Sequence, residues 1–278
     1  MNFYTDKKVV ITGGSSGIGR AAALLLAKAG ASVGLIARDS AKLDGVVREM
    51  ERLAVSEHQK FQSVACSVGD RAALNEAARS LVTNLGGIDV LINSAGISYP
   101  SYIEKTPDDV WDSMMQIDYM GTVNSVRAFL PAFMEKQRGT IVNVSSVVGY
   151  MGVFGYAAYG AAKFAVVGFS ECLRQDLLPY NITVSVIYPP DTDTPQWHEE
   201  NKIKPPETKA LSGNIKVLSA EQVAAALLAG AARGSFAIVP GFMNKVTWLL
   251  SRHLPWLVWM IVAGDLRKFW KKHPRQWA

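Results

Sequence analysis

The sequence predicts an α/β fold in which helices cover both faces of a doubly wound parallel sheet. Two observations carry this prediction: short apolar runs recur along the chain, and long helical patterns separate them. Repeated β-α units of this kind imply a parallel sheet. The runs expected to form strands are residues 9–12, 32–37, 61–66, 88–92, 140–145 and 183–187. Helices are expected at residues 17–29 and from the second strand to about Leu53.

Composition indicates a globular protein with one main domain. The chain has 278 residues, of which 49% are hydrophobic and 19% charged, so it can bury a substantial core. Cys66 and Cys172 show no C-x-x-C spacing, which favours a reducing compartment without disulfides. The four histidines are scattered, so no metal site is expected. The first strand begins close to Met1, and we therefore expect no signal peptide.

Positive charge is concentrated in the C-terminal segment. The formal net charge is +5, but residues from Phe242 onward hold seven basic residues against Asp265 and so carry +6. Nucleic-acid binding would place basic groups across a folded face, and none is expected here. The seven are Lys245, Arg252, Arg267, Lys268, Lys271, Lys272 and Arg275.

We divide the chain into a domain at residues 1–241 and a tail at residues 242–278. Within the domain, a polar, proline-containing stretch at about residues 191–214 interrupts the alternation of strands and helices. It is too long for a plain connector, and we expect it to form a substrate lid.

A glycine-rich turn at residues 12–19, Thr-Gly-Gly-Ser-Ser-Gly-Ile-Gly, predicts a nucleotide site at the carboxyl end of the first strand. Glycine permits a tight turn and close backbone approach, and the N-terminus of the following helix attracts a pyrophosphate. The alternative is a turn that binds nothing. The expected contacts, in a Rossmann-like arrangement, are Gly13, Ser15, Ser16, Gly17, Ile18 and Gly19.

Arg38 at the end of the second strand favours NADPH over NADH. An acidic residue there would accept both hydroxyls of an adenosine ribose, but this chain has Ala37-Arg38. The planar guanidinium suits a 2′-phosphate, and Lys42 can assist it. The alternative is a solvated arginine at a helix start.

Tyr159 and Lys163 lie four residues apart, so they share one face of a helix and can meet one ligand. A neighbouring cation favours the phenolate and is expected to bring the tyrosine pKa closer to neutral. A hydroxyl from the upstream Ser146 could polarise a carbonyl that the tyrosine protonates.

These motifs resemble the short-chain dehydrogenase/reductase family over roughly residues 7–240. The resemblance implies that the nicotinamide delivers hydride to a ketone, Tyr159 protonates its oxygen and Lys163 holds the nicotinamide ribose. Ser146, thirteen residues before Tyr159, is preferred to Ser145 for the carbonyl contact. Further cofactor contacts that the resemblance implies are Asn93, Ala95, Gly96, Pro189, Thr192 and Thr194. It also implies a homo-oligomer that pairs through the helices bearing Asp118 and Tyr159.

Asp118 departs from the family pattern, which normally has asparagine at this position. Aspartate is nearly isosteric but can carry charge beside Lys163, so a proton relay could be retuned. Equally, Asp118 can act only as a hydrogen-bonding group within its helix.

The stretch at residues 188–195, Tyr-Pro-Pro-Asp-Thr-Asp-Thr-Pro, and the segments at 199–202 and 204–208 resemble the 3-ketodihydrosphingosine reductase branch. That resemblance implies NADPH-dependent reduction of a long-chain sphingoid ketone. Asp191 or Asp193 could then orient the substrate ammonium, or could simply cap its own turn. The alternatives are a reductase of another hydrophobic ketone, such as a steroid or 3-oxoacyl lipid, and a non-catalytic nucleotide-binding regulator.

The tail has the composition of a membrane-surface segment. Its apolar run from Leu254 to Ala263 is shorter than the roughly 20 residues that a crossing needs. Five of the seven tryptophans lie beyond Phe242, among basic residues that attract anionic lipid. We expect peripheral attachment on the cytoplasmic side. The alternative is a helix packed in the core or in a dimer interface.

Overall fold

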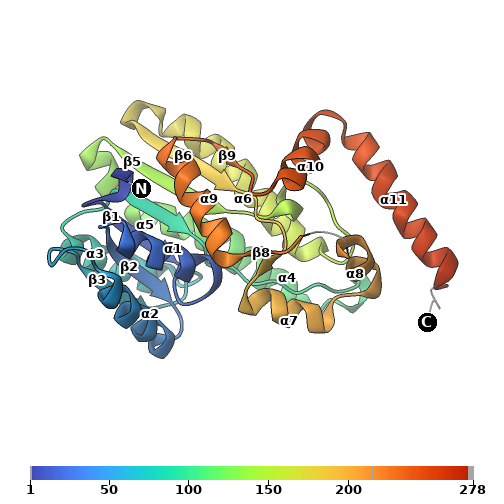
Figure 1. The fold of residues 1–278 in the computed structure, drawn as a ribbon, viewed down its shortest axis with the longest axis horizontal. Coiled ribbons are helices and arrows are strands. Elements are labelled where there is room, and N and C mark those ends of the chain that lie inside the picture. The colour runs from blue at the N-terminus through green and yellow to red at the C-terminus, as the bar shows by residue number, and fades with distance from the viewer. Residues whose placement is uncertain (1, 214–215, 275–278) are drawn as a thin grey trace.

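Seven parallel strands form the central sheet of the computed structural model, which describes residues 2–213 and 216–274 (Figure 1). The order is β3-β2-β1-β4-β5-β6-β9, so the chain runs outward in both directions from β1. Ligands of such sheets bind outside the carboxyl ends of the strands at this reversal. The strands are β1 (Lys8–Thr12), β2 (Ser32–Ala37), β3 (Phe61–Ala65), β4 (Val90–Asn93), β5 (Gly139–Val144), β6 (Ile182–Ile187) and β9 (Ala237–Ile238).

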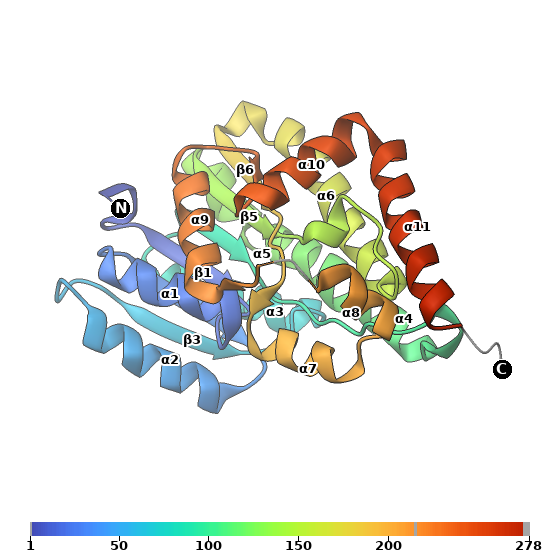
Figure 2. The ribbon, with the colours of Figure 1, turned by 45° about the vertical axis from the view of Figure 1, so that its right-hand side comes forward.

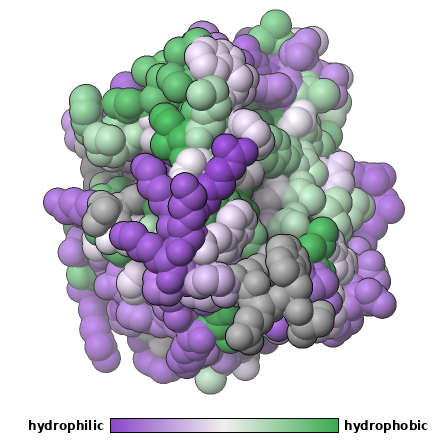
Figure 3. Space-filling view, turned by 90° about the vertical axis from the view of Figure 1, so that its right-hand side faces the viewer, coloured by the Kyte–Doolittle hydropathy of each residue, from purple (hydrophilic) through white to green (hydrophobic). Residues whose placement is uncertain are grey.

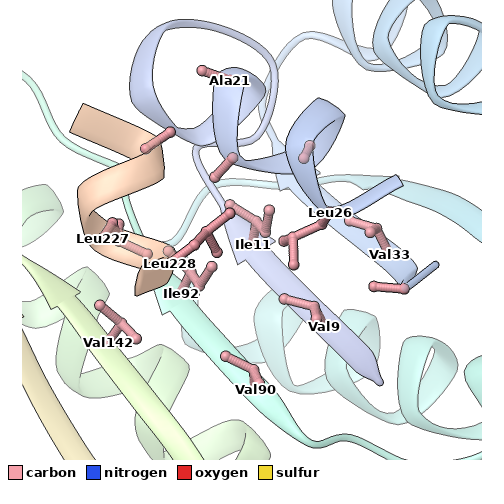
Figure 4. Close-up of a cluster of buried hydrophobic side chains, with 14 of the residues drawn as sticks. Val9, Ile11, Ala21, Leu26, Val33, Val90, Ile92, Val142, Leu227 and Leu228 are labelled. Carbon is pink, nitrogen blue, oxygen red and sulfur yellow. The ribbon is translucent and has the colours of Figure 1, made fainter. Parts of the chain in front are cut away.

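Helices cover the two faces of the sheet with separate hydrophobic cores. The helices of the main body are α1 (Gly17–Lys28), α2 (Ser40–Leu53), α3 (Arg71–Leu85), α4 (Asp108–Met114), α5 (Gly121–Lys136), α6 (Ala157–Asp176) and α9 (Ala220–Ala232). Successive strand residues point to opposite faces. Val9 and Ile11 therefore pack under α1 and α9, as Figure 4 shows, whereas Val10 packs with α3 and α5.

The doubly wound fold class that the sequence predicts is confirmed. Each of the six predicted strands occurs within two residues of its expected bounds. The two-residue β9, which pairs with Val186 and Ile187, was not expected. A small second sheet of β7 (Thr192–Asp193) and β8 (Leu218–Ser219) was also missed. Each of these three strands has only two residues, which is too short to show the alternating hydrophobic pattern of a strand.

The polar stretch after β6 is helical. It contains α7 (Pro195–Ile203) and α8 (Pro206–Ser212), each with proline at its start. Proline suits that position because its missing N–H would have no intrahelical partner. The final expected lid residue, Asn214, lies outside the described part of the chain.

The tail forms two helices, α10 (Phe242–His253) and α11 (Pro255–Lys272), bent by 117° at their junction. Figures 1 and 2 show them at one end of the molecule, with α11 returning towards α8. Neither helix alone is long and apolar enough to span a membrane, and the bent pair meets that test by length and composition only.

Side-chain contacts dock both tail helices on the domain. Asn244 of α10 donates to the carbonyl of Tyr188 at 2.8 Å. At the far end of α11, the Trp270 indole donates to the Glu207 carboxylate at 3.1 Å, and its ring meets Phe154 edge-on. The packed-helix alternative is therefore correct for one side of the tail.

Candidate active site

A cavity of about 960 Å³ opens at the carboxyl ends of β1, β2, β4 and β5. The glycine-rich turn and the end of β2 form one side of it. Residues that follow β6, together with α10 and α11, form the other. We call these the nucleotide side and the substrate side.

The glycine-rich turn is held tightly against the segment that follows β4. Gly13 has a φ of 72°, and a Cβ there would lie 2.6 Å from the Ala95 nitrogen. A Cβ on Gly19 would lie 2.4 Å from the Gly13 carbonyl oxygen. Both positions therefore exclude a side chain on steric grounds.

The first turn of α1 suits a phosphate. Ser16 precedes this helix, but its side chain makes no capping hydrogen bond. The amides of that turn thus remain available to an anion, where the helix dipole also favours one. The predicted residues that line the cavity here are Ser15, Ser16, Gly17 and Ile18, with Gly13 beside them.

The end of β2 presents a cation to the same side of the cavity. Arg38 is exposed and lines it. Lys42 also lines the cavity, but its Nζ lies 3.2 Å from the Asp39 carboxylate. Asp39 in turn accepts from the backbone amide of Lys42 and caps α2. Arg38 is therefore the better placed of the two for a 2′-phosphate.

The side chain of Asn93 does not line the cavity, so its predicted cofactor contact stays a prediction. It is buried and donates to Asn143 at 2.9 Å, and Asn143 donates to Ser170. This network ties β4 to β5 and α6. Ala95 and Gly96, which follow Asn93, do line the cavity.

The predicted catalytic residues converge where the two sides of the cavity meet. Ser146 follows β5, and its side chain is hydrogen-bonded to that of Tyr159 on α6. The Lys163 Nζ lies 5.4 Å from the Tyr159 ring centroid and donates to the Val144 carbonyl. Ser145 is buried and donates to the Lys163 carbonyl instead, so Ser146 is the serine that reaches the tyrosine.

The expected lowering of the Tyr159 pKa is wrong. Burial raises this pKa well above its usual value, and the carboxylates of Asp118 and Glu200 raise it further. Hydrogen bonds from Ser146 and Gln196 oppose the rise without reversing it. The phenol therefore stays protonated at neutral pH, which is the state that a proton donor needs.

Asp118 is fully buried within a π-helical turn at Met115–Met120. Its carboxylate accepts from the Ile97 amide at 2.8 Å and lies 3.8 Å from Lys163 Nζ. Burial raises its pKa to about 6, against the opposing effect of Lys163. Asp118 thus joins the loop after β4 to Lys163, and its contacts extend beyond its own helix.

The two candidate substrate aspartates differ in placement. Asp191 lines the cavity, whereas Asp193 is exposed and pairs with His198 at 2.8 Å on the surface. The proposed contact of Asp193 with substrate is therefore not supported. Of the remaining predicted residues on this side, Pro189, Thr192 and Thr194 line the cavity, and Thr194 also caps α7.

Sequence reasoning missed a polar cluster on the substrate side. Tyr156 donates to Glu200 at 2.7 Å, and Gln196 donates to the other oxygen of that carboxylate. Lys204 lies between Glu200 and Asp191, 3.8 Å from each. Gln196, Glu200 and Lys204 recur at intervals of four, a spacing that places them on one side of a helix and could have revealed them.

Comparison with known proteins now adds to this geometry. The family model described as short chain dehydrogenase matches residues 7–204. The chain belongs to this family. A structural match agrees with it: levodione reductase superposes with a TM-score of 0.79 at 26% identity, covering 87% of this chain and 98% of that one. Family and fold imply a nicotinamide nucleotide cofactor.

Several named relatives are reductases of sphingoid ketones, and others carry more general names. The 3-dehydrosphinganine reductase of Danio rerio is 41% identical, covering 82% of this chain and 69% of the relative. The 3-ketodihydrosphingosine reductase of Dictyostelium discoideum is 37% identical, covering 88% and 78%. The Mycobacterium tuberculosis protein named "Putative oxidoreductase SadH" is 31% identical over 98% of this chain and its own full length.

Proposed function

We propose that this protein reduces 3-ketodihydrosphingosine to dihydrosphingosine with NADPH, as a step of sphingolipid biosynthesis. The observation that carries the proposal is the meeting of a protonated Tyr159 with a carboxylate-rich pocket wall. The names of the relatives in Danio rerio and Dictyostelium discoideum support the same substrate.

The chain supplies each role that ketone reduction requires. The bound nicotinamide supplies the hydride. Tyr159 donates its phenolic proton to the ketone oxygen, and Ser146 stabilises the negative charge that develops there. Lys163, held by Val144 and Asp118, places a positive charge next to the phenol as it loses its proton.

NADPH is favoured because Arg38 lines the nucleotide side while the neighbouring carboxylate of Asp39 is engaged with Lys42. An unengaged carboxylate at this place would instead accept the hydroxyls of an NADH ribose.

The direct test measures NADPH oxidation by the full-length protein with 3-ketosphinganine in detergent micelles, with mass spectrometry of the product. We expect dihydrosphingosine to form in step with NADPH loss. A steroid ketone and a 3-oxoacyl lipid serve as competitors. Another hydrophobic ketone is the second candidate, because the mycobacterial protein matched over its full length is named only as an oxidoreductase and its name gives no substrate. Faster turnover of either competitor would favour it.

We also propose that the tail rests on the cytoplasmic surface of a membrane. One side of α10 and α11 is docked, but the other leaves large apolar side chains exposed, including Trp256 at 59% and Trp259 at 66%. Figure 3 shows apolar and hydrophilic areas side by side at this end of the molecule. The other exposed apolar residues of the tail are Phe242, Met243, Leu249, Leu254, Met260 and Ile261. Such residues next to basic groups suit an anionic lipid interface.

Vesicle co-sedimentation at low salt tests this attachment. Replacing Trp256, Trp259 and Met260 together by glutamine should release the protein from phosphatidylserine-containing vesicles. Leu178→Gln, which changes an exposed apolar residue outside the tail, just before the amino end of β6, should not. Wild-type protein that ignores the vesicles would contradict the proposal. Point variants are preferable to deletion because Asn244 and Val262 of the tail line the cavity.

Pairing into a homo-oligomer is a further proposal. Met115 in the turn that holds Asp118 and Phe164 on the Tyr159 helix are both exposed apolar residues. Light scattering after gel filtration should give at least twice the monomer mass, and Phe164→Glu should lower it. A monomeric wild type would contradict this pairing.

A further inference from the structure

Three buried side chains on the substrate side form a charged group beside the catalytic tyrosine. Glu200 is only 8% exposed and Lys204 only 5%, and Tyr156 is equally buried. The Tyr156 ring lies 5.8 Å from that of Tyr159, so the Glu200 carboxylate that Tyr156 holds lies close to the reacting phenol. That carboxylate also acts on the pKa of Tyr159, which indicates the same proximity.

When the neighbouring Asp191 is counted with this group, negative charge exceeds positive charge. Asp191 and Glu200 contribute two negative charges, and Lys204 contributes one positive charge between them. The other buried carboxylate of the site, Asp118, already has Lys163 as its partner. One negative charge is therefore left over on a wall of the cavity that both Asp191 and Glu200 line. Because the two carboxylates share one lysine, each is only partly neutralised, and a cation that enters the cavity is attracted to this wall.

We propose that Glu200, together with Asp191, binds the ammonium group of the substrate and makes the enzyme selective for amino ketones. The inference rests on the proposed function, in which the ammonium is attached to the carbon next to the ketone. When the ketone oxygen is bound at Tyr159, the ammonium on the next carbon lies on the side of Glu200 and Asp191.

The surrounding residues position the carboxylate. Tyr156 and Gln196 donate to its two oxygens, and Lys204 approaches it from the next turn of the chain. A carboxylate held in this way can accept from a substrate ammonium without first reorganising. Asp193 has no such setting, because it lies on the surface against His198.

The test compares two ketones in full-length protein: 3-ketosphinganine, and the same molecule with hydrogen in place of its amino group. Glu200→Gln removes the charge at constant shape. A charge-assisted hydrogen bond contributes about 1.5–3 kcal/mol, so kcat/KM for the amino ketone should fall about 10- to 150-fold. The deamino ketone should lose at least about tenfold less, because the change in the Tyr159 pKa affects both ketones alike whereas the ammonium contact affects only one. Glu199→Gln is the matched control, because Glu199 is 71% exposed and pairs with Lys202.

Equal losses on both ketones in Glu200→Gln would overturn the inference and leave Glu200 a structural role. Asp191→Asn is the second variant, and it should lower the preference for the amino ketone in the same direction. Tyr156→Phe should keep the preference, since the Glu200 charge remains. A wild-type protein that reduces steroids but neither of these two ketones would overturn the proposed function itself. A wild type that prefers the deamino ketone would overturn the ammonium site alone.

Discussion

The two sides of the cavity are built in different ways. The nucleotide side comes from short turns at the ends of neighbouring strands, where each contact lies within a few residues of a glycine or strand end. The substrate side brings together residues from α6, α7, α10 and α11, and the tail is fixed by contacts such as Trp270 with Glu207. We therefore expect the first side to bind the cofactor whatever the ketone, and the second to distinguish one ketone from another.

The largest effect is expected where the two sides meet. Tyr159→Phe removes the proton donor but keeps the ring, so kcat should fall by roughly 10²–10⁴-fold. NADPH binding, measured by fluorescence titration, should be retained because the nucleotide side is unchanged. Substantial turnover by this variant would show that another group protonates the ketone.

A change confined to the nucleotide side should alter cofactor use for every ketone alike. Arg38→Ala removes a charge-assisted contact, and affinity for NADPH should weaken about 10- to 150-fold. Affinity for NADH should hardly change. Lys42→Ala should have the smaller effect, since Lys42 is already paired with Asp39. A wild type that uses both cofactors equally well would refute the role of Arg38.

Asp118 connects the loop of the nucleotide side to Lys163 and should make stability depend on pH. Its pKa is about 6 in the folded protein and 3.8 ordinarily, so its contribution is present below pH 4 and is lost as pH rises through 6. From pH 4 to 7, Asp118→Asn should therefore gain about 2 kcal/mol in unfolding free energy relative to wild type. Urea unfolding across this range measures the gain.

The kinetics of the same variant give an independent check. Wild-type kcat/KM should show an ionisation near pH 6 that Asp118→Asn lacks. Superimposable pH–rate profiles for the two proteins would leave Asp118 only its hydrogen bond to Ile97.

The smallest effect should come from the outer end of the substrate side. Trp270→Phe keeps a ring near Phe154 but loses the hydrogen bond to Glu207, worth about 0.5–1.5 kcal/mol. KM for the long-chain ketone should rise while the affinity for NADPH stays constant. An equal rise in both constants would mean that the tail supports the whole fold and has no separate part in substrate binding.

The nucleotide side could be predicted from the sequence because the residues that form it lie close to strand ends along the chain. A glycine turn after the first strand and an arginine after the second act through local geometry, which does not depend on how the rest of the chain packs. The hydrogen bond between Asn93 and Asn143 on the adjacent strand could not be predicted, because the two residues lie 50 positions apart in the chain. The Tyr159 pKa was misjudged because burial and the Asp118 carboxylate, both consequences of tertiary packing, outweigh the nearby lysine.

The residues of the substrate side could be predicted only in part. Asp191 and Asp193 look equivalent in sequence, yet one lines the cavity and the other faces solvent. Glu200 lies on α7, which was not predicted because its segment is polar and contains prolines. The docking of α11 depends on a carboxylate 63 residues away, which no local pattern indicates.

The most direct test of this account compares the two ketones in the wild-type protein with NADPH. On the substrate side, the two carboxylates of Asp191 and Glu200 share one lysine near Tyr159, so kcat/KM should be at least about tenfold higher for 3-ketosphinganine than for its deamino analogue. Equal values, or a preference for the uncharged ketone, would contradict the claim that this side of the cavity selects a sphingoid base.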